Sequence, residues 1–385
     1  MIHISNKQDC CGCTACASIC AQNAISMTVD EMGFEYPVVD TNCCTDCGLC
    51  EKVCAFHNNY DKSNNFAVPL AYAVRHRNME EVKSSRSGAM FIALSDYIFR
   101  NNGVVYGVGY ATHFRAVHKR ITNRGDCKEL KGSKYVQSDL DGIFHQIKED
   151  LQQGLYVLFV GTPCQTAGLR SFINKKNSEK LLVCDIVCHG VPSPLLWEEY
   201  LNYMEQKMNC TIEQVNFRDK VKGWAAHYES FVFQNGKKII TRTFTDLFYK
   251  HLMFRPSCAV CKYANTQRPS DITLADFWGW EKVDSDFNKD NMGCSLVLVN
   301  SEKGKRTFEA VLSEIHVIST TIDQCLQPNL QYPSSFSPFY TAFWKDYQQK
   351  GFAFVLRRYG DQGICHKLLR LKGKIKQIIK RIIRK

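Results

Sequence analysis

Eight cysteines near the start of the chain repeat one spacing twice, and their type and spacing suit metal chemistry. The two copies of C-x2-C-x2-C-x3-C consist of Cys10, Cys13, Cys16 and Cys20, followed by Cys44, Cys47, Cys50 and Cys54. Three thiolates on a tight loop can bind one face of a 4Fe–4S cluster, and in a duplicated motif the fourth cysteine binds the other cluster. The spacing therefore predicts one cluster on Cys10, Cys13, Cys16 and Cys54 and a second on Cys44, Cys47, Cys50 and Cys20.

A pair of zinc knuckles or a lattice of disulfides could also account for these cysteines. Zinc sites seldom need three cysteines at such short spacing twice over. The chain has 20 cysteines and a polar N-terminus without a signal-peptide hydrophobic region, so we expect a cytoplasmic protein, in which disulfides are disfavoured. Iron–sulfur binding is the favoured interpretation, and Cys11 and Cys43, each next to a predicted ligand, are expected to be packing thiols.

The chain divides into four parts by composition. Residues 1–58 are expected to form an α+β ferredoxin-like module of the bacterial type with two 4Fe–4S clusters. Residues 59–69, rich in Asn, Asp and Ser, are expected to be a linker. Residues 70–345 are expected to form a larger α/β domain with a mixed sheet, in two halves of about 70–150 and 151–345, and residues 346–385 to form a tail.

Apolar runs alternate with amphipathic stretches in the α/β domain. Strands are expected at residues 71–76, 103–110, 155–161, 181–187, 272–278 and 294–300. Helices are expected at residues 88–103, 142–154 and 194–207. Neither a G-x-G-x-x-G after a strand nor a G-x-x-x-x-G-K-[ST] motif occurs, so no nucleotide is predicted from these fingerprints.

Two further cysteines follow predicted strands, and one pair has CxxC spacing. Cys164 lies on a Gly-Thr-Pro turn after the strand 155–161, and Cys188 follows the next strand. Because ligands gather at the carboxyl ends of strands in open α/β sheets, these two thiols and the pair Cys258 and Cys261 could form a third four-cysteine site. The alternative is that they are buried core cysteines, which is our interpretation of Cys184 inside its strand.

Several motifs of the large domain occur in an order that resembles a known family. They are GTPCQTAGL, VCHGVPSPLLWEEYL, NFRDKVKGW, RPSCAVCKYANTQRPSDITLADFWG and GCSLVLVNSEKG. From about Ala71 to Gly304 the chain is similar to the beta-subunit family of coenzyme F(420)-reducing hydrogenases and dehydrogenases, which also contains the plant 7-hydroxymethyl chlorophyll a reductase. The resemblance implies FAD bound beside a 4Fe–4S cluster, and a third cluster held by Cys164, Cys188, Cys258 and Cys261.

The resemblance also implies a flavin site made by three segments. Its residues here are Ser87 and Gly88 of SRSGAM, Ser133, Lys134 and Tyr135 of GSKYVQS, and Thr162 and Pro163 of the GTPC turn. A lysine and backbone amides can face a pyrophosphate. The sequence departs from the family at Ala89, where a second glycine is common. Without the resemblance, Lys134 and Tyr135 would be interpreted as ordinary surface residues.

Other motif residues are candidates for a substrate pocket. They are His189, Arg218, Trp224, Asp276 and Trp278. The alternative for the two tryptophans is a place in the core, and for Arg218 an ion pair with its neighbour Asp219. No residue is identified as a general acid.

Three functions compete for this sequence. The first is an iron–sulfur flavoprotein oxidoreductase that takes electrons from reduced ferredoxin or a similar donor and passes them through the clusters to FAD and an organic substrate, or in reverse. Resemblance to proteins encoded among bacterial surface-polysaccharide genes implies a sugar or lipid-linked glycan precursor as substrate. The alternative is an electron-transfer subunit of a larger, deazaflavin-reducing hydrogenase- or dehydrogenase-like complex, and the third is a zinc-stabilised interaction protein.

Basic charge is concentrated in the tail. The formal net charge is +11, and residues 366–385 contain nine Lys or Arg and no acid, which leaves +2 for the rest and argues against nucleic-acid binding. One face of a helix would carry Leu371, Ile375, Ile378, Ile379 and Ile382. We therefore expect a basic amphipathic helix that holds the protein peripherally on the anionic inner face of the cell membrane. The alternative is docking on the body or on another subunit, and a homo-oligomer is compatible with the sequence.

Overall fold

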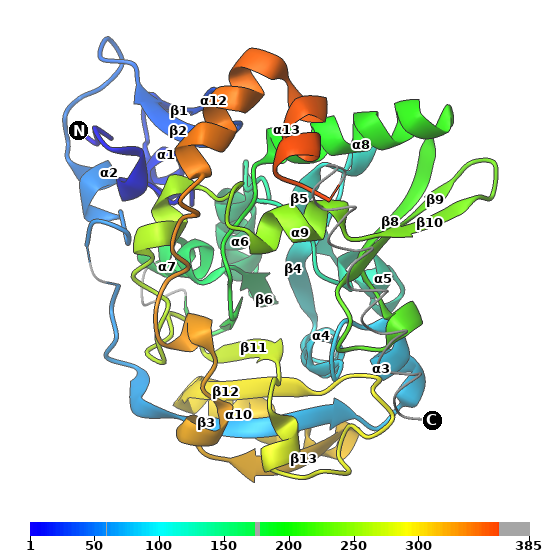
Figure 1. Cartoon of the computed structure of the whole chain (residues 1–385). Helices are drawn as coiled ribbons and strands as arrows, with labels where there is room; N and C mark the ends of the chain where they lie inside the picture. Colours follow the sequence, from blue (N-terminus) through cyan, green and yellow to red (C-terminus); the bar gives the residue numbers. More distant parts are fainter. Residues whose placement is uncertain (59, 174–177, 362–385) are drawn as a thin grey trace, which may run out of the picture.

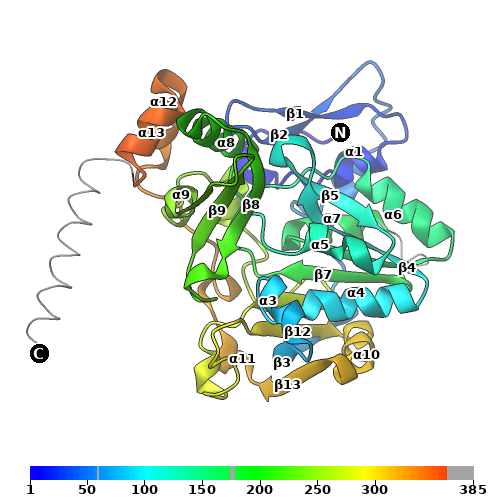
Figure 2. The same cartoon turned by 90° about the vertical axis from the view of Figure 1, so that its right-hand side faces the viewer.

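The computed structural model describes residues 1–58, 60–173 and 178–361 of the 385-residue chain. Figure 1 shows the N-terminal module in blue at one side of the molecule, and Figure 2, turned by 90°, shows the large sheet with helices on both faces. A smaller sheet with its own helices lies beside both parts. None of the helices in these described ranges has the length and apolar character needed to cross a membrane.

The N-terminal module is a two-stranded antiparallel sheet with two short helices. It contains α1 (Ala15–Ile19), β1 (Ile25–Val29), β2 (Glu35–Val39) and α2 (Leu49–Lys52). Each cysteine motif turns at the residue after its second cysteine, where Thr14 and Gly48 take left-handed φ values of 64° and 72°. The two loops therefore have matching backbones, as a duplicated motif requires, and the predicted α+β arrangement is confirmed.

Eight strands form one mixed sheet in the order β13-β3-β12-β11-β7-β6-β4-β5. Their bounds are β3 Asn65–His76, β4 Gly103–Tyr110, β5 Ala116–Ile121, β6 Tyr156–Gly161, β7 Leu181–Ile186, β11 Ile272–Asp276, β12 Ser295–Ser301 and β13 Ile315–Thr320. β11, β7, β6 and β4 run parallel in the middle of the sheet, and the outer pairings are antiparallel. The six predicted strands and the mixed sheet are confirmed, while β5 and β13 were not predicted.

Helices cover both faces of this sheet. One face packs against helices that include α4 (Met90–Arg100) and α10 (Glu302–Ala310), with α3 (Met79–Ser84) and α5 (Cys127–Leu130) nearby. The other face packs against α6 (Ile143–Gln152), α7 (Pro163–Phe172) and the N-terminal module, whose α1 contacts α7. A further short helix, α11 (Ile322–Cys325), lies against β3. Both halves predicted for the large domain contribute strands to this single sheet.

A second sheet carries an aromatic core of its own. Its strands are β8 (Ile212–Asp219), β9 (Tyr228–Phe233) and β10 (Lys238–Thr241), and its helices are α8 (Pro194–Met208), α9 (Thr243–Tyr249), α12 (Tyr340–Lys350) and α13 (Phe352–Arg358). Trp197, Phe217, Phe231 and Phe244 are fully buried among these elements. The helix at 194–207 is confirmed, whereas the three strands were not predicted.

The beginning of the predicted tail is part of this second body. The boundary expected after residue 345 falls inside α12, and the apolar side chains of Phe352, Val355 and Leu356 on α13 are buried in the aromatic core. The isoleucine stripe from Leu371 to Ile382 lies outside the described residues.

Candidate functional site

The parallel strands end at one edge of the large sheet and bring distant motifs together there. Thr162 and Cys164 follow β6, Cys188 follows β7, and Asp276 is the last residue of β11. Because neighbouring parallel strands run in the same direction, their carboxyl ends meet at this edge.

The third cysteine group consists of Cys164, Cys188, Cys258 and Cys261. Burial, followed by the charges of the nearby Cys164 and Cys261, raises the pKa of Cys188 to about 12. The pKa of Cys258 is raised by burial and then by Cys188, Cys261 and Cys164. The Val191 amide donates to the Cys258 sulfur at 3.4 Å, and the Gly190 amide donates to the Cys188 sulfur at 3.4 Å. The four thiols therefore lie near one another, with backbone donors directed at two of them.

The first cysteine group consists of Cys10, Cys13, Cys16 and Cys54. Burial raises the pKa of Cys16, and the charges of Cys13, Cys10 and Cys54 raise it further. Cys54 belongs to the second copy of the motif, so the structure brings the fourth cysteine of one copy to the first three of the other.

The second cysteine group consists of the fourth cysteine of the first copy of the motif and the first three cysteines of the second copy. A surface cavity of about 220 Å³ is lined by Cys20, Cys44, Cys47 and Cys50. Cys47 is exposed and Cys44 half-buried, so this group lies nearest the solvent. Cys43 is exposed beside it, which differs from the expectation of a packing thiol.

The three groups follow one another through the molecule. Cys16, Cys50, Cys20 and Cys54 share one small apolar cluster, which joins the first and second groups. Cys11 is buried and its thiol lies near those of Cys13 and Cys164, which joins the first and third groups. A Cβ atom on Gly168 of α7 would lie 2.7 Å from the Cys13 sulfur, so only glycine permits this close approach. From the solvent toward the central cavity, the second group comes first, the first group follows it, and the third group comes last.

Arg255 lies between the first and third groups and is fully buried. Its Nε donates to the Cys10 carbonyl at 2.8 Å and its Nη2 to the Glu35 carbonyl at 2.7 Å, while Nη1 donates to Gln137 Oε1 at 3.0 Å. The guanidinium lies 4.3 Å from the centre of the Tyr36 ring. No carboxylate of the described residues forms an ion pair with Arg255. Burial lowers the pKa of its guanidinium, and the thiols of Cys10 and Cys258 are among the groups that raise it.

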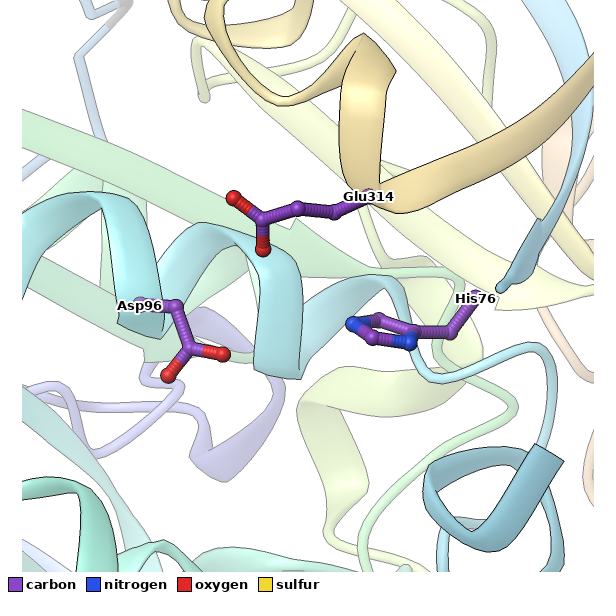
Figure 3. A group of neighbouring side chains, drawn as sticks. All are labelled: His76, Asp96 and Glu314. Atoms are coloured by element: carbon purple, nitrogen blue, oxygen red, sulfur yellow. The ribbon is translucent and has the colours of Figure 1, made fainter. Parts of the chain in front are cut away.

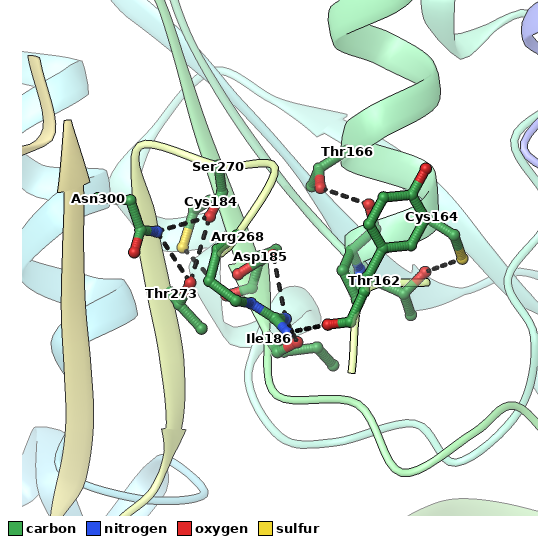
Figure 4. Close-up of polar contacts among 12 residues, drawn as sticks. Thr162, Cys164, Thr166, Cys184, Asp185, Ile186, Arg268, Ser270, Thr273 and Asn300 are labelled. Atoms are coloured by element: carbon green, nitrogen blue, oxygen red, sulfur yellow. Dashed lines mark hydrogen bonds and ion pairs between the residues drawn. The ribbon is translucent and has the colours of Figure 1, made fainter. Parts of the chain in front are cut away.

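A second buried arginine, Arg268, donates to the carbonyl oxygens of Tyr263 and Asn265, which follow the CxxC pair, at 2.5 and 3.3 Å. Arg268 forms an ion pair with Asp185 at 3.1 Å, and both side chains are buried. Figure 4 shows the Arg268 guanidinium directed at Asp185 and at the Ile186 carbonyl, which accepts a hydrogen bond at 2.9 Å.

Cys184 is fully buried in β7, on the face of the sheet opposite the Cys164 turn, and is a core thiol as predicted.

A central cavity of about 470 Å³ opens at the same edge of the sheet, and Cys188 lines it. Of the predicted flavin residues, it is lined by Ser87, Ser133, Lys134, Tyr135 and Thr162. The Lys134 ammonium donates to the carbonyls of Glu129 and Lys131 at 3.1 and 2.9 Å, and burial lowers its pKa to about 7. Lys134 therefore braces its own loop and is not a free cation in the cavity.

Two predicted flavin residues and Ala89 have different surroundings. Gly88 and Pro163 do not line the cavity; Gly88 donates its amide to Ser295 Oγ at 2.9 Å, and a Cβ there would meet the Val74 carbonyl. Ala89, which does line the cavity, has φ 65° and ψ 23° as the residue before α4. That left-handed conformation favours glycine.

The substrate-pocket candidates gather at one wall of the central cavity. Four of them line it: His189, Arg218, Asp276 and Trp278. Trp224 is buried behind Trp278, and the two rings stack at 4.6 Å, so Trp224 is a core aromatic. The neighbour pair Arg218–Asp219 does not form, because Asp219 pairs with Lys238 at 2.7 Å while Arg218 is directed toward Tyr135 and Asp276.

His189 is held by two side chains at this wall. Its Nδ1 lies 2.8 Å from Asn329 Oδ1, and its Nε2 lies 2.9 Å from Nε2 of His251. Neither Asn329 nor His251 was predicted from the sequence. His189 also follows Cys188 directly, so the third cysteine group and the cavity share this segment.

Three residues that do not line the cavity lie close together: Figure 3 shows the side chains of His76, Asp96 and Glu314 turned toward one another. Both carboxylates already pair with arginines, Asp96 with Arg124 and Glu314 with Arg100, each at 2.5 Å. His76 Nδ1 accepts a hydrogen bond from the Asn78 amide at 3.0 Å, so the proton of the neutral ring lies on Nε2. These contacts leave no free set of metal ligands, and we assign no metal to this group.

Arg255, Arg268 and Arg86, whose Nη2 donates to Asp276 Oδ2 at 2.7 Å, were also missed by the sequence interpretation. The first two flank the CxxC pair as R-P-S-C-A-V-C and, seven residues later, Arg268. That flanking was the available signal, but arginine is usually exposed, so the residue type gave no reason to expect burial.

Comparisons with known proteins concern mainly the segment that contains the third cysteine group. Residues 155–324 match the family model that describes the C-terminal part of the beta subunit of coenzyme F420 hydrogenase/dehydrogenase. This segment contains β6, β7 and all four members of the third cysteine group, and here the resemblance is confirmed. A search of curated proteins finds no similar sequence. Among solved structures, a chain from the xenon derivatization of the F420-reducing [NiFe] hydrogenase complex from Methanosarcina barkeri aligns with 16% identity and a TM-score of 0.47, covering 74% of this chain and 89% of that chain.

Proposed function

We propose that this protein is an iron–sulfur flavoprotein oxidoreductase that exchanges electrons between a one-electron donor, such as reduced ferredoxin, and an organic substrate. The observation that carries the proposal is the position of Cys188, which belongs to the third cysteine group and also lines the central cavity. The match of residues 155–324 to a hydrogenase/dehydrogenase beta-subunit family supports the same class of chemistry.

The surroundings of the cysteines fit anionic clusters. A fully buried arginine without a carboxylate partner is costly, because a charge removed from water needs compensation. Arg255 has no such partner among the described residues and instead faces thiols of the first and third groups. Clusters ligated by cysteine thiolates at these two groups would supply the missing negative charge.

The central cavity has the size expected for a cofactor or small-molecule site. Ser87, Ser133, Tyr135 and Thr162 are the predicted flavin residues that could hold FAD there. When bound, clusters would transfer single electrons and a flavin would exchange them in pairs with substrate. The protein contributes a fixed order of thiol groups and a cavity whose wall includes Cys188 of the third group.

One anaerobic purification tests the proposal. Iron, acid-labile sulfide and flavin are quantified per chain in the full-length protein, and we expect about twelve irons, about twelve sulfides and about one FAD. A colourless protein, or one that contains zinc in place of iron, would favour the zinc-stabilised interaction protein.

The alternative function is an electron-transfer subunit of a larger complex. It is favoured by the match of residues 155–324 to a family of hydrogenase and dehydrogenase beta subunits. The two functions differ in the substrate: a subunit without a substrate site would reduce only a deazaflavin or a partner protein. Copurification of a stable partner, together with no turnover of organic acceptors by the isolated chain, would favour the subunit.

Two finer features are also part of the proposal. The substrate class, a sugar or lipid-linked glycan precursor, is inferred from resemblance to relatives among surface-polysaccharide genes. Peripheral attachment to an anionic membrane is inferred from the basic residues of 366–385, which lie outside the described residues.

A further inference from the structure

Arg218, the seventh residue of β8, lines the central cavity and is only 5% exposed. Its Nη1 donates to the Tyr135 hydroxyl at 2.7 Å. Its Nε and Nη2 atoms are buried and have no hydrogen-bond partner among the described residues. The nearest carboxylate, that of Asp276, lies 3.7 Å from Nη2, which is too far for a hydrogen bond. One edge of the guanidinium therefore has donors without an acceptor.

Asp276 cannot fully compensate this charge, because it is already used. It accepts a hydrogen bond from Arg86 Nη2 at 2.7 Å on Oδ2 and one from Trp224 Nε1 at 3.4 Å on Oδ1. Two guanidinium groups thus share one carboxylate at this wall. His227 adds no further positive charge, since burial, followed by the charge of Arg86, lowers its pKa to about 4 and leaves the ring neutral. The wall carries an excess of one positive charge.

Flat rings form the surface beside this charge. Trp278 stacks on Trp224 at 4.6 Å and on His227 at 5.5 Å, and the Tyr249 hydroxyl lies 2.6 Å from His227 Nδ1. Of these residues, Trp278, His227 and Tyr249 line the cavity. A molecule bound here would place an apolar or ring-shaped part against the aromatic surface and a negative group against Arg218.

We propose that Arg218 binds an oxyanion, a carboxylate or a phosphate, carried by the organic substrate. The inference rests on the proposed function, because it assigns the substrate class of the same cavity. The two unpaired N–H groups of one guanidinium edge match two oxygens of such a group, which is the bidentate geometry that arginine prefers. Without that ligand, two charged donors would stay buried and unpaired, which native proteins rarely tolerate. The pyrophosphate of a flavin has the same chemistry, so the test must separate the two sources.

The test uses full-length protein purified anaerobically, with inorganic phosphate as the probe in isothermal titration calorimetry at constant ionic strength. The variants are Arg218→Gln, Arg218→Lys as a charge-retaining second variant, and Arg115→Gln as a matched control. Arg115 is an exposed arginine that pairs with Asp139 at 3.0 Å and does not line the cavity. FAD per chain and circular dichroism are measured on each protein.

We expect the wild type and Arg115→Gln to bind one phosphate with equal Kd, Arg218→Lys to bind more weakly, and Arg218→Gln to bind about tenfold more weakly or worse. FAD content is expected to be equal in all four proteins. Three results would overturn the proposal: no binding of phosphate to the wild type, equal binding to Arg218→Gln, or loss of FAD in the Arg218 variants, which would assign the arginine to the flavin. If Arg218→Gln does not fold, Arg218→Lys with wild-type affinity also overturns it. Failure of the proposed function is a separate outcome, because it would show as wild-type protein without FAD or iron, whatever the phosphate affinity.

Discussion

The Nε atom of Arg255 donates a hydrogen bond of 2.8 Å to the carbonyl oxygen of Cys10, a residue 245 positions earlier in the chain. This contact fixes one buried positive charge between the first and third cysteine groups. The second group has no buried cation among the described residues. Its surface cavity is lined by Met1, whose exposed amino group pairs with Asp46 at 2.9 Å.

Arg255→Gln is expected to shift the reduction potentials of the first- and third-group clusters to more negative values. Reduction adds a negative charge, and the buried cation that stabilises it would be absent. Arg255→Lys should give a smaller shift, because it retains the charge. An anaerobic redox titration followed by EPR measures this. The second-group cluster is the internal control, and equal shifts at all three clusters would contradict the assignment of Arg255.

Cys258→Ser is expected to lower the iron content from about twelve to about eight atoms per chain, because a 4Fe–4S cluster needs its four thiolates. Cys184→Ala, a change at a buried thiol inside β7, is the matched control and should retain about twelve. The measurement is iron per chain after anaerobic purification. Full iron content in Cys258→Ser would remove the third cluster from the proposal.

The crossed arrangement of the first and second groups can be tested with two double variants. Cys16→Ala with Cys54→Ala removes two ligands of the first group, so about four irons should be lost. Cys50→Ala with Cys54→Ala removes one ligand from each group, so about eight should be lost. If instead each copy of the motif held its own cluster, the two results would be exchanged.

Asp185→Asn is expected to lower the free energy of unfolding by about 3–5 kcal/mol, because it leaves the buried Arg268 guanidinium without its counter-charge. Asp286→Asn is a control on an exposed ion pair: Asp286 pairs with Lys289 at 3.4 Å, and its removal should cost about 1 kcal/mol or less. Urea unfolding of both variants gives the comparison. Equal, small effects would mean that the Asp185–Arg268 pair does not stabilise the CxxC loop.

Deletion of residues 366–385 is expected to abolish binding to anionic vesicles, since each basic residue near such a surface contributes roughly 1 kcal/mol. The deletion leaves α12 and α13 intact, because α13 ends at Arg358. Co-sedimentation with anionic and neutral vesicles measures it. Equal recovery of the full-length protein on both vesicle types would rule out an electrostatic anchor.

Repetition and periodicity made much of the fold predictable from the sequence. The duplicated cysteine spacing predicted which cysteines gather in the first and second groups, while the crossed ligation of two clusters stays a prediction. The strands β6, β7 and β11 are continuous apolar runs, and their carboxyl ends led to Cys164 and Cys188. The strands β8 and β10 were missed because exposed polar residues interrupt them: Glu213, Gln214 and Lys238 are all exposed.

Contacts between distant side chains were beyond sequence reasoning. Nothing in the types of Arg255 and Arg218 distinguishes a buried arginine from a surface one, and only the fold brings Cys10 or Tyr135 next to them. Lys134 shows the opposite case: the family resemblance implied that it faces the pyrophosphate of a flavin, but its ammonium donates to carbonyls of its own loop. The direction of a long side chain depends on local backbone geometry that one sequence does not reveal.

The long separation of Cys10 and Arg255 has a consequence for how the protein is made. At a synthesis rate of about 5–20 residues per second, Cys10 leaves the ribosome roughly 10–50 s before Arg255. During that interval the nascent N-terminal thiols lack the buried cation of Arg255, so both oxidants and cluster-assembly factors can reach them. The third group completes only when Cys261 emerges. Maturation therefore follows the order of translation, and the N-terminal module is the part most exposed to oxygen while the chain is still growing.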